Sequence, residues 1–165
     1  MSNYKGAPMI KLRSFRWKDA EFVKSVLFNV QEQYLNVLPG YIEGLTRYID
    51  NKDLEPFGRI RMIEIRGIKV GWISEIDIDE LNLYVGHYYL LPTYHQKGIG
   101  SEVLKYYLST LKSMGKKSVT VDAHLSMDDV VRFYKKNGFV EVVLDHDSTH
   151  IKTYDKHFIK LKCHL

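Results

Sequence analysis

Residues 94–101, Tyr-His-Gln-Lys-Gly-Ile-Gly-Ser, separate a long apolar run that ends at Pro92 from an amphipathic segment. Gly98 and Gly100 let the backbone turn tightly and approach a ligand without a Cβ in the way. At the start of a helix, successive N–H groups and the helix dipole both favour an anion. The stretch therefore predicts a phosphate or pyrophosphate site beside Lys97. A tight turn that binds nothing is the alternative interpretation.

Spacing excludes two better-known glycine motifs. A dinucleotide-binding Gly-x-Gly-x-x-Gly pattern needs a third glycine at position 103, where the sequence has Val103. A P-loop needs Gly-Lys-Ser/Thr with another glycine ahead of it, and neither Gly98 nor Gly115 meets that requirement. Neither motif therefore accounts for the stretch at 94–101.

The chain beyond this stretch alternates between helices and strands. Apolar side chains recur at helical spacing up to Gly115, which suits the end of a helix. The elements predicted here are a helix over 100–114, a short strand at 119–121, a helix that opens at Ser126-Met127-Asp128-Asp129, a stretch that resembles an N-terminal cap, and stops at Asn137-Gly138, and closing strands over 139–144 and 157–161.

The N-terminal half begins with helices and continues into a meander. Phe22, Val23, Val26, Leu27 and Val30 form one helical stripe, and Asp19 is placed to accept a backbone hydrogen bond at its start. The elements predicted here are a strand over 9–15, a helix over 19–33, a helix after Pro39-Gly40, and three antiparallel strands over 59–66, 70–78 and 81–91 with turns at 67–69 and 79–80.

The predicted order is β-α-α-β-β-β-α-β-α-β-β. This order indicates an α/β fold, an α+β mixed sheet that is mostly antiparallel, with helices on both faces. The length of 165 residues suits one domain over residues 1–165. Hydrophobic residues make up 45% of the chain, which excludes a disordered protein.

Charge and cysteine content limit the function classes. The net charge of +4 favours an anionic partner only weakly, and no interleaved basic and aromatic face points to nucleic acid. A single cysteine, Cys163, excludes an internal disulfide and a cysteine-based zinc cluster. With no signal-peptide pattern and no long apolar span, we expect a cytoplasmic domain without membrane attachment.

Two blocks of the sequence together resemble the GNAT N-acetyltransferase superfamily. The first is His95-Gln-Lys-Gly-Ile-Gly100 between a long strand and a helix, similar to the family's Gln/Arg-x-x-Gly-x-Gly/Ala. The second is Tyr134-Lys-Lys-Asn-Gly138-Phe139, similar to the family's Tyr-x-x-x-Gly-Phe. Two positions depart from the pattern: His95 replaces Gln or Arg, and Met127 stands where many members have Asn.

The resemblance implies acetyl-CoA as co-substrate and no metal. Backbone N–H groups near residues 90 and 91 would receive the thioester carbonyl where the strand splays from its neighbour, and those of residues 96–101 would hold the pyrophosphate. The implied cofactor-binding residues are Leu90, Leu91, His95, Gln96, Lys97, Gly98, Ile99, Gly100 and Ser101.

Tyr134 matches the family tyrosine that donates to the departing sulfur. An ordinary tyrosine has a pKa of about 10 and a thiol about 8.5, so full proton transfer is uphill by ~2 kcal/mol. A hydrogen bond to the developing thiolate is therefore the expected role. The general base is less defined: Asp122 is the first candidate, and Glu75, Glu80 and a water chain are the alternatives.

The histidines and tyrosines have simpler interpretations. His146 and His150 have the spacing of a helical metal site, but the polar residues around them predict a solvated loop. His124 is expected to be a hydrogen-bonded loop residue. Several tyrosines gather near the site and are expected mostly to pack with their hydroxyls at the edge: Tyr84, Tyr88, Tyr89, Tyr106 and Tyr107.

The expected function is transfer of acetyl from acetyl-CoA to a primary amine by direct attack in a ternary complex. The acceptor is a small molecule or a peptide, without nucleic acid or membrane as partner, and a homodimer is allowed. A CoA-binding regulatory module with the same fold and no turnover is the alternative, and the departures at His95 and Met127 motivate it.

Overall fold

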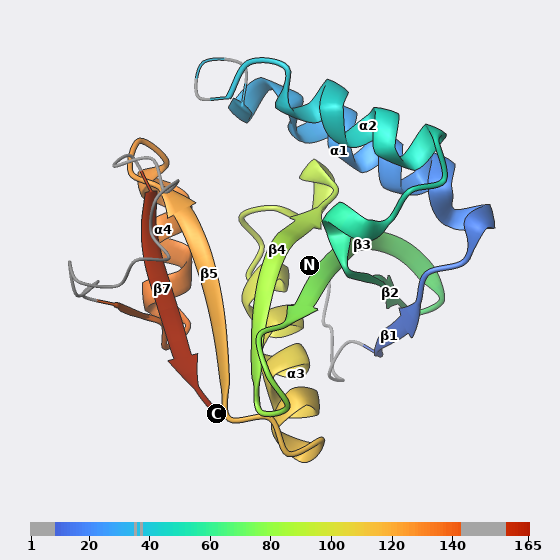
Figure 1. Ribbon diagram of the computed structural model, residues 1–165. Coiled ribbons are helices and arrows are strands. Elements are labelled where there is room, and N and C mark those ends of the chain that lie inside the picture. Colours follow the sequence, from blue (N-terminus) through green and yellow to red (C-terminus); the bar gives the residue numbers. More distant parts are fainter. Residues whose placement is uncertain (1–8, 35, 37, 143–157) are drawn as a thin grey trace, which may run out of the picture.

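The computed structural model describes residues 9–34, 36, 38–142 and 158–165. In these residues the strands form one sheet in the order β1-β2-β3-β4-β5-β7-β6 (Figure 1). Only β4 and β5 run parallel, and the other neighbours are antiparallel. The strands are β1 Ile10–Ser14, β2 Arg59–Ile65, β3 Ile68–Asp77, β4 Asn82–Leu90, β5 Ser118–His124, β6 Val140–Glu141 and β7 Phe158–His164.

Helices cover both faces of this sheet, and each face has its own apolar core. On one face α1 and α2 pack on Met62, Trp72 and Tyr89, and Figure 1 shows these two helices lying side by side. On the other face α3 and α4 pack on the strands from β2 to β7. The helices are α1 Ala20–Tyr34, α2 Tyr41–Asp50, α3 Ile99–Ser113 and α4 Asp128–Lys136, with short 3-10 turns at Trp17–Asp19, Glu55–Phe57 and Pro92–Tyr94.

Strand β4 separates from β5 halfway along its length. The parallel ladder joins Asn82 to Ser118 and ends where Val85 meets Val121, although both strands continue beyond that point. Figure 1 shows β4 (green) and β5 (orange) diverging toward their C-terminal ends. A parallel sheet that opens in this way leaves backbone N–H groups facing the gap rather than a neighbouring strand.

A β-bulge lies where the two strands part. Ser74 of β3 pairs with His87 and Glu75 pairs with Val85, so Gly86 is the extra residue in β4. Because side chains alternate along a strand, one extra residue moves all later side chains to the opposite face. Val85 therefore packs in the α3 core, whereas His87 contacts the aromatic rings of the α1–α2 face.

The structure confirms the predicted fold class and element order, with local corrections. The β2–β3 turn lies at Arg66 and Gly67, both at positive φ, so Ile68 already belongs to β3. Met127 occupies the N-cap position of α4 without a side-chain bond to the helix, and the Ser126 hydroxyl bonds to His124 Nδ1 at 2.7 Å. Asp19 accepts a backbone hydrogen bond at the start of the helical segment, as predicted, but the donor is the preceding Arg16 N–H at 2.9 Å, and Asp19 also pairs with Arg13.

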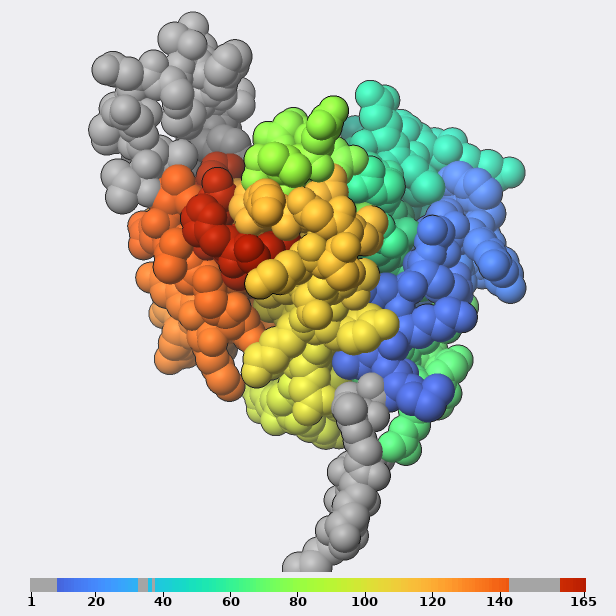
Figure 2. Space-filling view, turned by 90° about the horizontal axis from the view of Figure 1, so that it is seen from below, coloured from blue at the N-terminus to red at the C-terminus, as the bar shows by residue number. Residues whose placement is uncertain are grey.

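Seen from below, α3 (yellow) occupies the middle of the face in Figure 2, between the orange α4 region and the blue N-terminal segment. The helix is buried through Val103, Leu104, Tyr107 and Leu111. Among the helices of the described residues, none has the length and apolar character needed to cross a bilayer.

Candidate active site

The gap between β4 and β5 opens into a cavity of about 450 Å³. Its wall combines the end of β4, the turn that follows it, the end of β5 and helix α4. The structure brings together most of the residues predicted from the sequence, since the lining includes Leu90, His95, Gln96, Gly98, Gly100, Ser101, Asp122 and Tyr134. Leu91, Lys97 and Ile99 lie beside the cavity and are not in its lining.

The turn before α3 has the backbone geometry of an anion cradle. Gln96 and Gly98 both have positive φ, 56° and 75°, and α3 begins directly after Gly98. The N–H of Glu102 is the first to reach back into the turn, at 3.1 Å from the Gly98 carbonyl. Helix geometry leaves the preceding N–H groups, on residues 99–101, without an intrahelical acceptor. These groups and the helix dipole suit a pyrophosphate.

Contacts from β4 and α4 hold this first helical turn in place. The Tyr88 hydroxyl donates to the Gly100 carbonyl at 2.7 Å, and Asn137 donates to the Ser101 hydroxyl at 3.0 Å. Gly100 packs against the Phe133 ring of α4, and a Cβ there would lie 3.4 Å from the ring, at van der Waals contact. Burial and the neighbouring Tyr134 raise the pKa of Tyr88 well above its ordinary value, which keeps its hydroxyl a donor.

His95 turns back onto β4. Its Nε2 lies 2.7 Å from the Leu90 carbonyl, and because a carbonyl can only accept, Nε2 carries the proton. The side chain that departs from the family pattern therefore bonds to the strand end. The cradle itself is made of backbone N–H groups and does not depend on this side chain.

The two predicted amides at the end of β4 differ in their surroundings. The N–H of Leu91 donates to the Val70 carbonyl at 2.8 Å and belongs to the sheet. Since N–H groups alternate in direction along an antiparallel strand, that of Leu90 points the other way, toward the gap. Leu90 is thus the residue whose amide faces the cavity.

Tyr134 forms part of the opposite wall. It is buried on α4, with its ring packed edge-on against Phe133 and Phe139 at centroid distances of 5.3 and 5.1 Å. Phe133 in turn stacks on Tyr88, 6.1 Å away. These rings restrict how Tyr134, which lines the cavity, can move.

The candidate bases separate clearly in space. Asp122 lines the cavity and forms an ion pair with Lys160 of β7 at 3.2 Å, where the two residues pair across the strands. Glu75 is buried away from the cavity among two arginines and a tyrosine. Glu80 lies exposed at the β3–β4 turn. Of the three carboxylates, Asp122 alone lines the cavity.

Sequence reasoning missed His87, which also lines the cavity. Its Nδ1 lies 2.6 Å from the Ser74 hydroxyl and its Nε2 lies 2.7 Å from the Tyr41 hydroxyl. Burial lowers the pKa of His87 to about 4, so the ring is neutral near pH 7. Gly86, a glycine inside a strand pattern, was the available signal, because such a glycine often marks a bulge.

The other histidines and Met127 were also singled out from the sequence. His124 bonds to Ser126 and packs edge-on against Phe158 at 5.0 Å. Met127 stands at the N-cap of α4 without a side-chain bond to the helix. His146 and His150 lie outside the described residues. Within the described part of the chain, no three His, Cys, Asp or Glu side chains gather as a metal site would require.

Solved acetyltransferase structures have the same fold. The PaiA N-acetyltransferase of Thermoplasma acidophilum, solved in complex with coenzyme A, superposes with a TM-score of 0.74 at 19% identity, covering 94% of this chain and 99% of that one. Ard1 of Thermoplasma volcanium superposes with a TM-score of 0.63 at 21% identity, covering 94% of this chain and 97% of that one. A spermidine N-acetyltransferase chimera, SpeG of Vibrio cholerae with hSSAT, superposes with a TM-score of 0.69 at 14% identity, covering 94% of this chain and 95% of that one. At these identities the likeness shows the fold alone.

The sequence itself supplies the family. A search among curated proteins found no match. The sequence pattern of the Acetyltransferase (GNAT) family, however, matches residues 23–139, well over half of the chain, and this span contains both the Gly98–Gly100 turn and Tyr134. With the splayed β4–β5 pair and the backbone cradle at the start of α3, the match leads to one conclusion: this chain is a member of the GNAT acetyltransferase family.

Proposed function

We propose that the chain is an N-acetyltransferase that moves an acetyl group from acetyl-CoA to a primary amine within a ternary complex. The observation that carries the proposal is the single cavity in which the N–H cradle before α3, the end of β4 and Tyr134 meet. A pyrophosphate in the cradle would direct the rest of CoA along the gap between β4 and β5.

The residues present fit this co-substrate. The cradle offers N–H groups and two glycines, Gly98 with open space around its Cα and Gly100 packed on Phe133. Lys97 precedes Gly98 in the cradle, and Lys136 lines the cavity. Acetyl-CoA supplies the acetyl group as a thioester. An N–H donor aimed at the carbonyl oxygen, where charge develops, lowers the barrier to attack.

Leu90 and Tyr134 take complementary roles in the proposed reaction. The Leu90 N–H donates to the carbonyl oxygen as the amine nitrogen bonds to the carbonyl carbon. Tyr134 donates to the sulfur as the carbon–sulfur bond breaks, which stabilises the thiolate without requiring full proton transfer. The amine proton leaves toward Asp122, a carboxylate of β5 in the cavity wall. Asp122 is the proposed acceptor of that proton, with a water chain as the alternative route.

The proposal is tested by free-thiol release from acetyl-CoA with a panel of primary amines. Tyr134→Phe should lower kcat about 10²-fold, the lower range for loss of one positioned proton donor. The matched control is Tyr106→Phe, an exposed tyrosine on α3, which should leave kcat unchanged. Absence of thiol release with every amine, together with no thermal shift by CoA, would refute the proposal. CoA binding without transfer would identify a regulatory module instead.

A second variant tests the cradle. Gly98→Glu places a negative charge beside the pyrophosphate and a side chain at φ +75°, and CoA binding should weaken about 10²-fold or more, which corresponds to ~3 kcal/mol. Gly67→Glu is the control, because Gly67 has φ +79° and open space but lies in the β2–β3 turn. Calorimetric titration with CoA measures both, and equal affinities would contradict the assignment of the cradle.

A further inference from the structure

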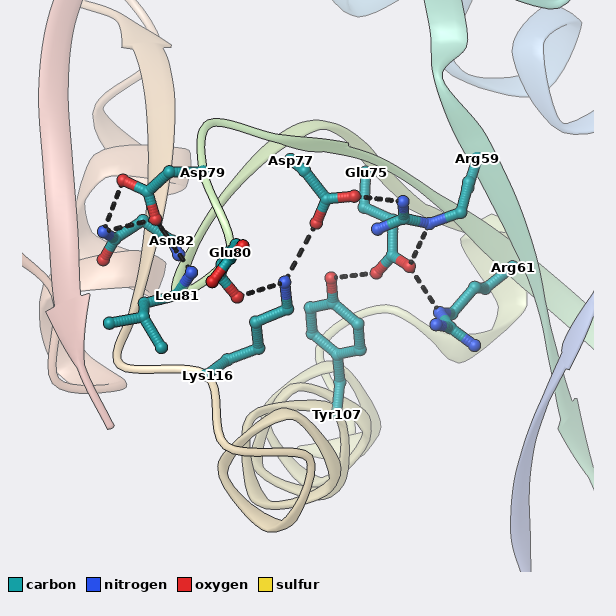
Figure 3. A network of polar contacts seen from close by, with 10 residues as sticks. All are labelled: Arg59, Arg61, Glu75, Asp77, Asp79, Glu80, Leu81, Asn82, Tyr107 and Lys116. Atoms are coloured by element: carbon teal, nitrogen blue, oxygen red, sulfur yellow. Dashed lines mark hydrogen bonds and ion pairs between the residues drawn. The ribbon is translucent and has the colours of Figure 1, made fainter.

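The bulge at Gly86 sets where the cavity begins, and a buried charged cluster lies directly beside it. Glu75, which pairs with Val85 at the bulge, is 0% exposed. Its Oε1 accepts hydrogen bonds from Arg61 Nε at 2.7 Å and from Arg59 Nε at 3.2 Å. Its Oε2 accepts one from the Tyr107 hydroxyl at 2.6 Å. Figure 3 shows the four side chains converging from β2, β3 and α3.

The cluster divides its two carboxylate oxygens between two elements. Oε1 is held by arginines of β2, and Arg59 is itself held by Asp77. The Oε2 contact with Tyr107 crosses from the sheet to α3. Burying a carboxylate costs free energy unless it is paired and hydrogen-bonded, and the two arginines supply that pairing at Oε1 while Oε2 bonds to the helix.

Helix α3 carries the cofactor cradle in its first turn, and Tyr107 lies on the same helix. A helix transmits position along its axis because its backbone is hydrogen-bonded throughout. Two tyrosine hydroxyls thus tie the sheet to α3: Tyr107 on Glu75 of β3 beside the bulge, and Tyr88 of β4 on the Gly100 carbonyl. Together they fix how far the cradle lies from the Leu90 amide.

We propose that the Glu75–Tyr107 hydrogen bond is a positioning contact for acetyl transfer. It fixes the position of α3 along the sheet relative to the bulge. A pyrophosphate in the cradle and a thioester carbonyl at Leu90 can then be bound at the same time. Glu75 and Tyr107 touch neither substrate in this arrangement. The inference rests on the proposed function and adds to it two residues outside the cavity wall.

Burial supports this role for Tyr107. Burial and the adjacent Glu75 carboxylate both raise the pKa of Tyr107 far above its ordinary value. The hydroxyl therefore remains a donor over the whole range in which the protein can be assayed. A contact that does not titrate is suited to holding a distance.

The test compares two neighbouring tyrosines of α3. Tyr107→Phe removes the hydroxyl and keeps the buried ring, and Tyr106→Phe makes the same change at an exposed position. Because misplacing reacting groups by ~1 Å can cost about 10²-fold in rate, we expect kcat for Tyr107→Phe to fall at least about tenfold. The affinity for CoA should change by no more than about twofold, since the N–H groups of the cradle are retained.

A stability control separates positioning from partial unfolding. Glu75→Gln should reproduce the kcat loss. Asp19→Asn perturbs another fully buried carboxylate, one held by Arg13 and Lys69 away from the cavity, and should lower Tm without lowering kcat per CoA-binding site. Unchanged kcat in Tyr107→Phe overturns the proposal. The proposal is also overturned if kcat falls only in proportion to the fraction of the protein that no longer binds CoA, because partial unfolding then explains the loss.

A third measurement keeps this inference distinct from the proposed function. If the wild-type protein neither binds CoA nor releases thiol, the proposed function fails and the contact is judged by amide hydrogen exchange. Faster exchange at residues 86–90 and 99–101 in Tyr107→Phe than in Tyr106→Phe supports a contact that fixes the bulge and the cradle. Equal exchange in the two variants overturns it.

Discussion

The bulge at Gly86 is held by charged side chains on one face of the sheet and by neutral ones on the other. On the α3 face, Glu75 binds two arginines and Tyr107. On the α1–α2 face, His87 bonds to the hydroxyls of Ser74 and Tyr41. Ser74 and Glu75 are adjacent in β3, so consecutive residues anchor the same bulge from opposite sides.

The difference follows from what each face adjoins. Glu75 lies outside the cavity, where fixed guanidinium groups can balance its charge permanently. His87 lines the cavity, which in the proposed function also receives the acceptor amine. A neutral ring held by two hydroxyls keeps its position there without a fixed counter-charge that an incoming ammonium group would disturb. The fixed charges around Glu75 thus lie behind the site, whereas His87 is held by neutral hydrogen bonds at its wall.

The largest expected effect concerns the charged face. Glu75→Gln weakens the charged hydrogen bonds to the partly exposed Arg59 and Arg61 and should lower the free energy of unfolding by about 3 kcal/mol, the upper range for hydrogen bonds to a charged group. Urea denaturation measures the loss. The matched control is Glu43→Gln, which removes an exposed ion pair with Arg47 on α2 and should cost less than about 0.5 kcal/mol. Similar losses in both variants would contradict a special role for the buried cluster.

The second effect is a pH dependence that belongs to the neutral face. The ordinary pKa of histidine is 6.5 and that of His87 in the folded chain is about 4. Below pH 6.5 this histidine binds a proton in the unfolded chain but not in the folded one. The free energy of unfolding therefore falls as pH decreases, and it levels off below about pH 4. The loss between pH 7 and 4.5 should be about 2 kcal/mol.

His87→Gln should remove that slope while keeping a polar side chain between Ser74 and Tyr41. Urea denaturation at several pH values compares the variant with the wild type. Asp19 does not interfere, because hydrogen bonds from Arg13 lower its pKa and its contribution is lost only below the ordinary value of 3.8. A slope that persists in the variant would mean that another group is responsible.

The same comparison explains what the sequence could and could not predict. The cradle is encoded locally: Gly98, Gly100 and the amphipathic helix after them are contiguous, and the positive φ of Gly98 is what a glycine there suggests. The cluster around Glu75 joins residues from β2, β3 and α3, and no pattern in a single segment connects them. Local chemistry can also mislead, as at Ser126, whose hydroxyl bonds to His124 instead of capping α4.

The register of β4 could not be predicted from the sequence, for a related reason. The apolar run before Pro92 predicted a strand correctly, but the side on which each residue lies depends on the bulge. Without it, His87 would share the α3 face with Val85, and the Ser74–His87 bond would not form. Gly86 marks the place, yet only the pairing with β3 shows that the extra residue is in β4.

The smallest expected change in stability is the most informative test of the two faces, because it distinguishes the positioning of His87 from the stability of the whole fold. Ser74→Ala removes one neutral hydrogen bond to His87 and should cost about 1 kcal/mol of unfolding free energy, well below the cost at Glu75. If neutral contacts fix the cavity wall, this small loss should still raise KM for the amine, because His87 can then turn within the cavity. Thr46→Ala, which removes a side-chain bond within α2, is the control and should leave KM unchanged. An unaltered KM in Ser74→Ala would mean that Tyr41 alone positions His87, and the neutral face would then depend on α2 rather than on the sheet.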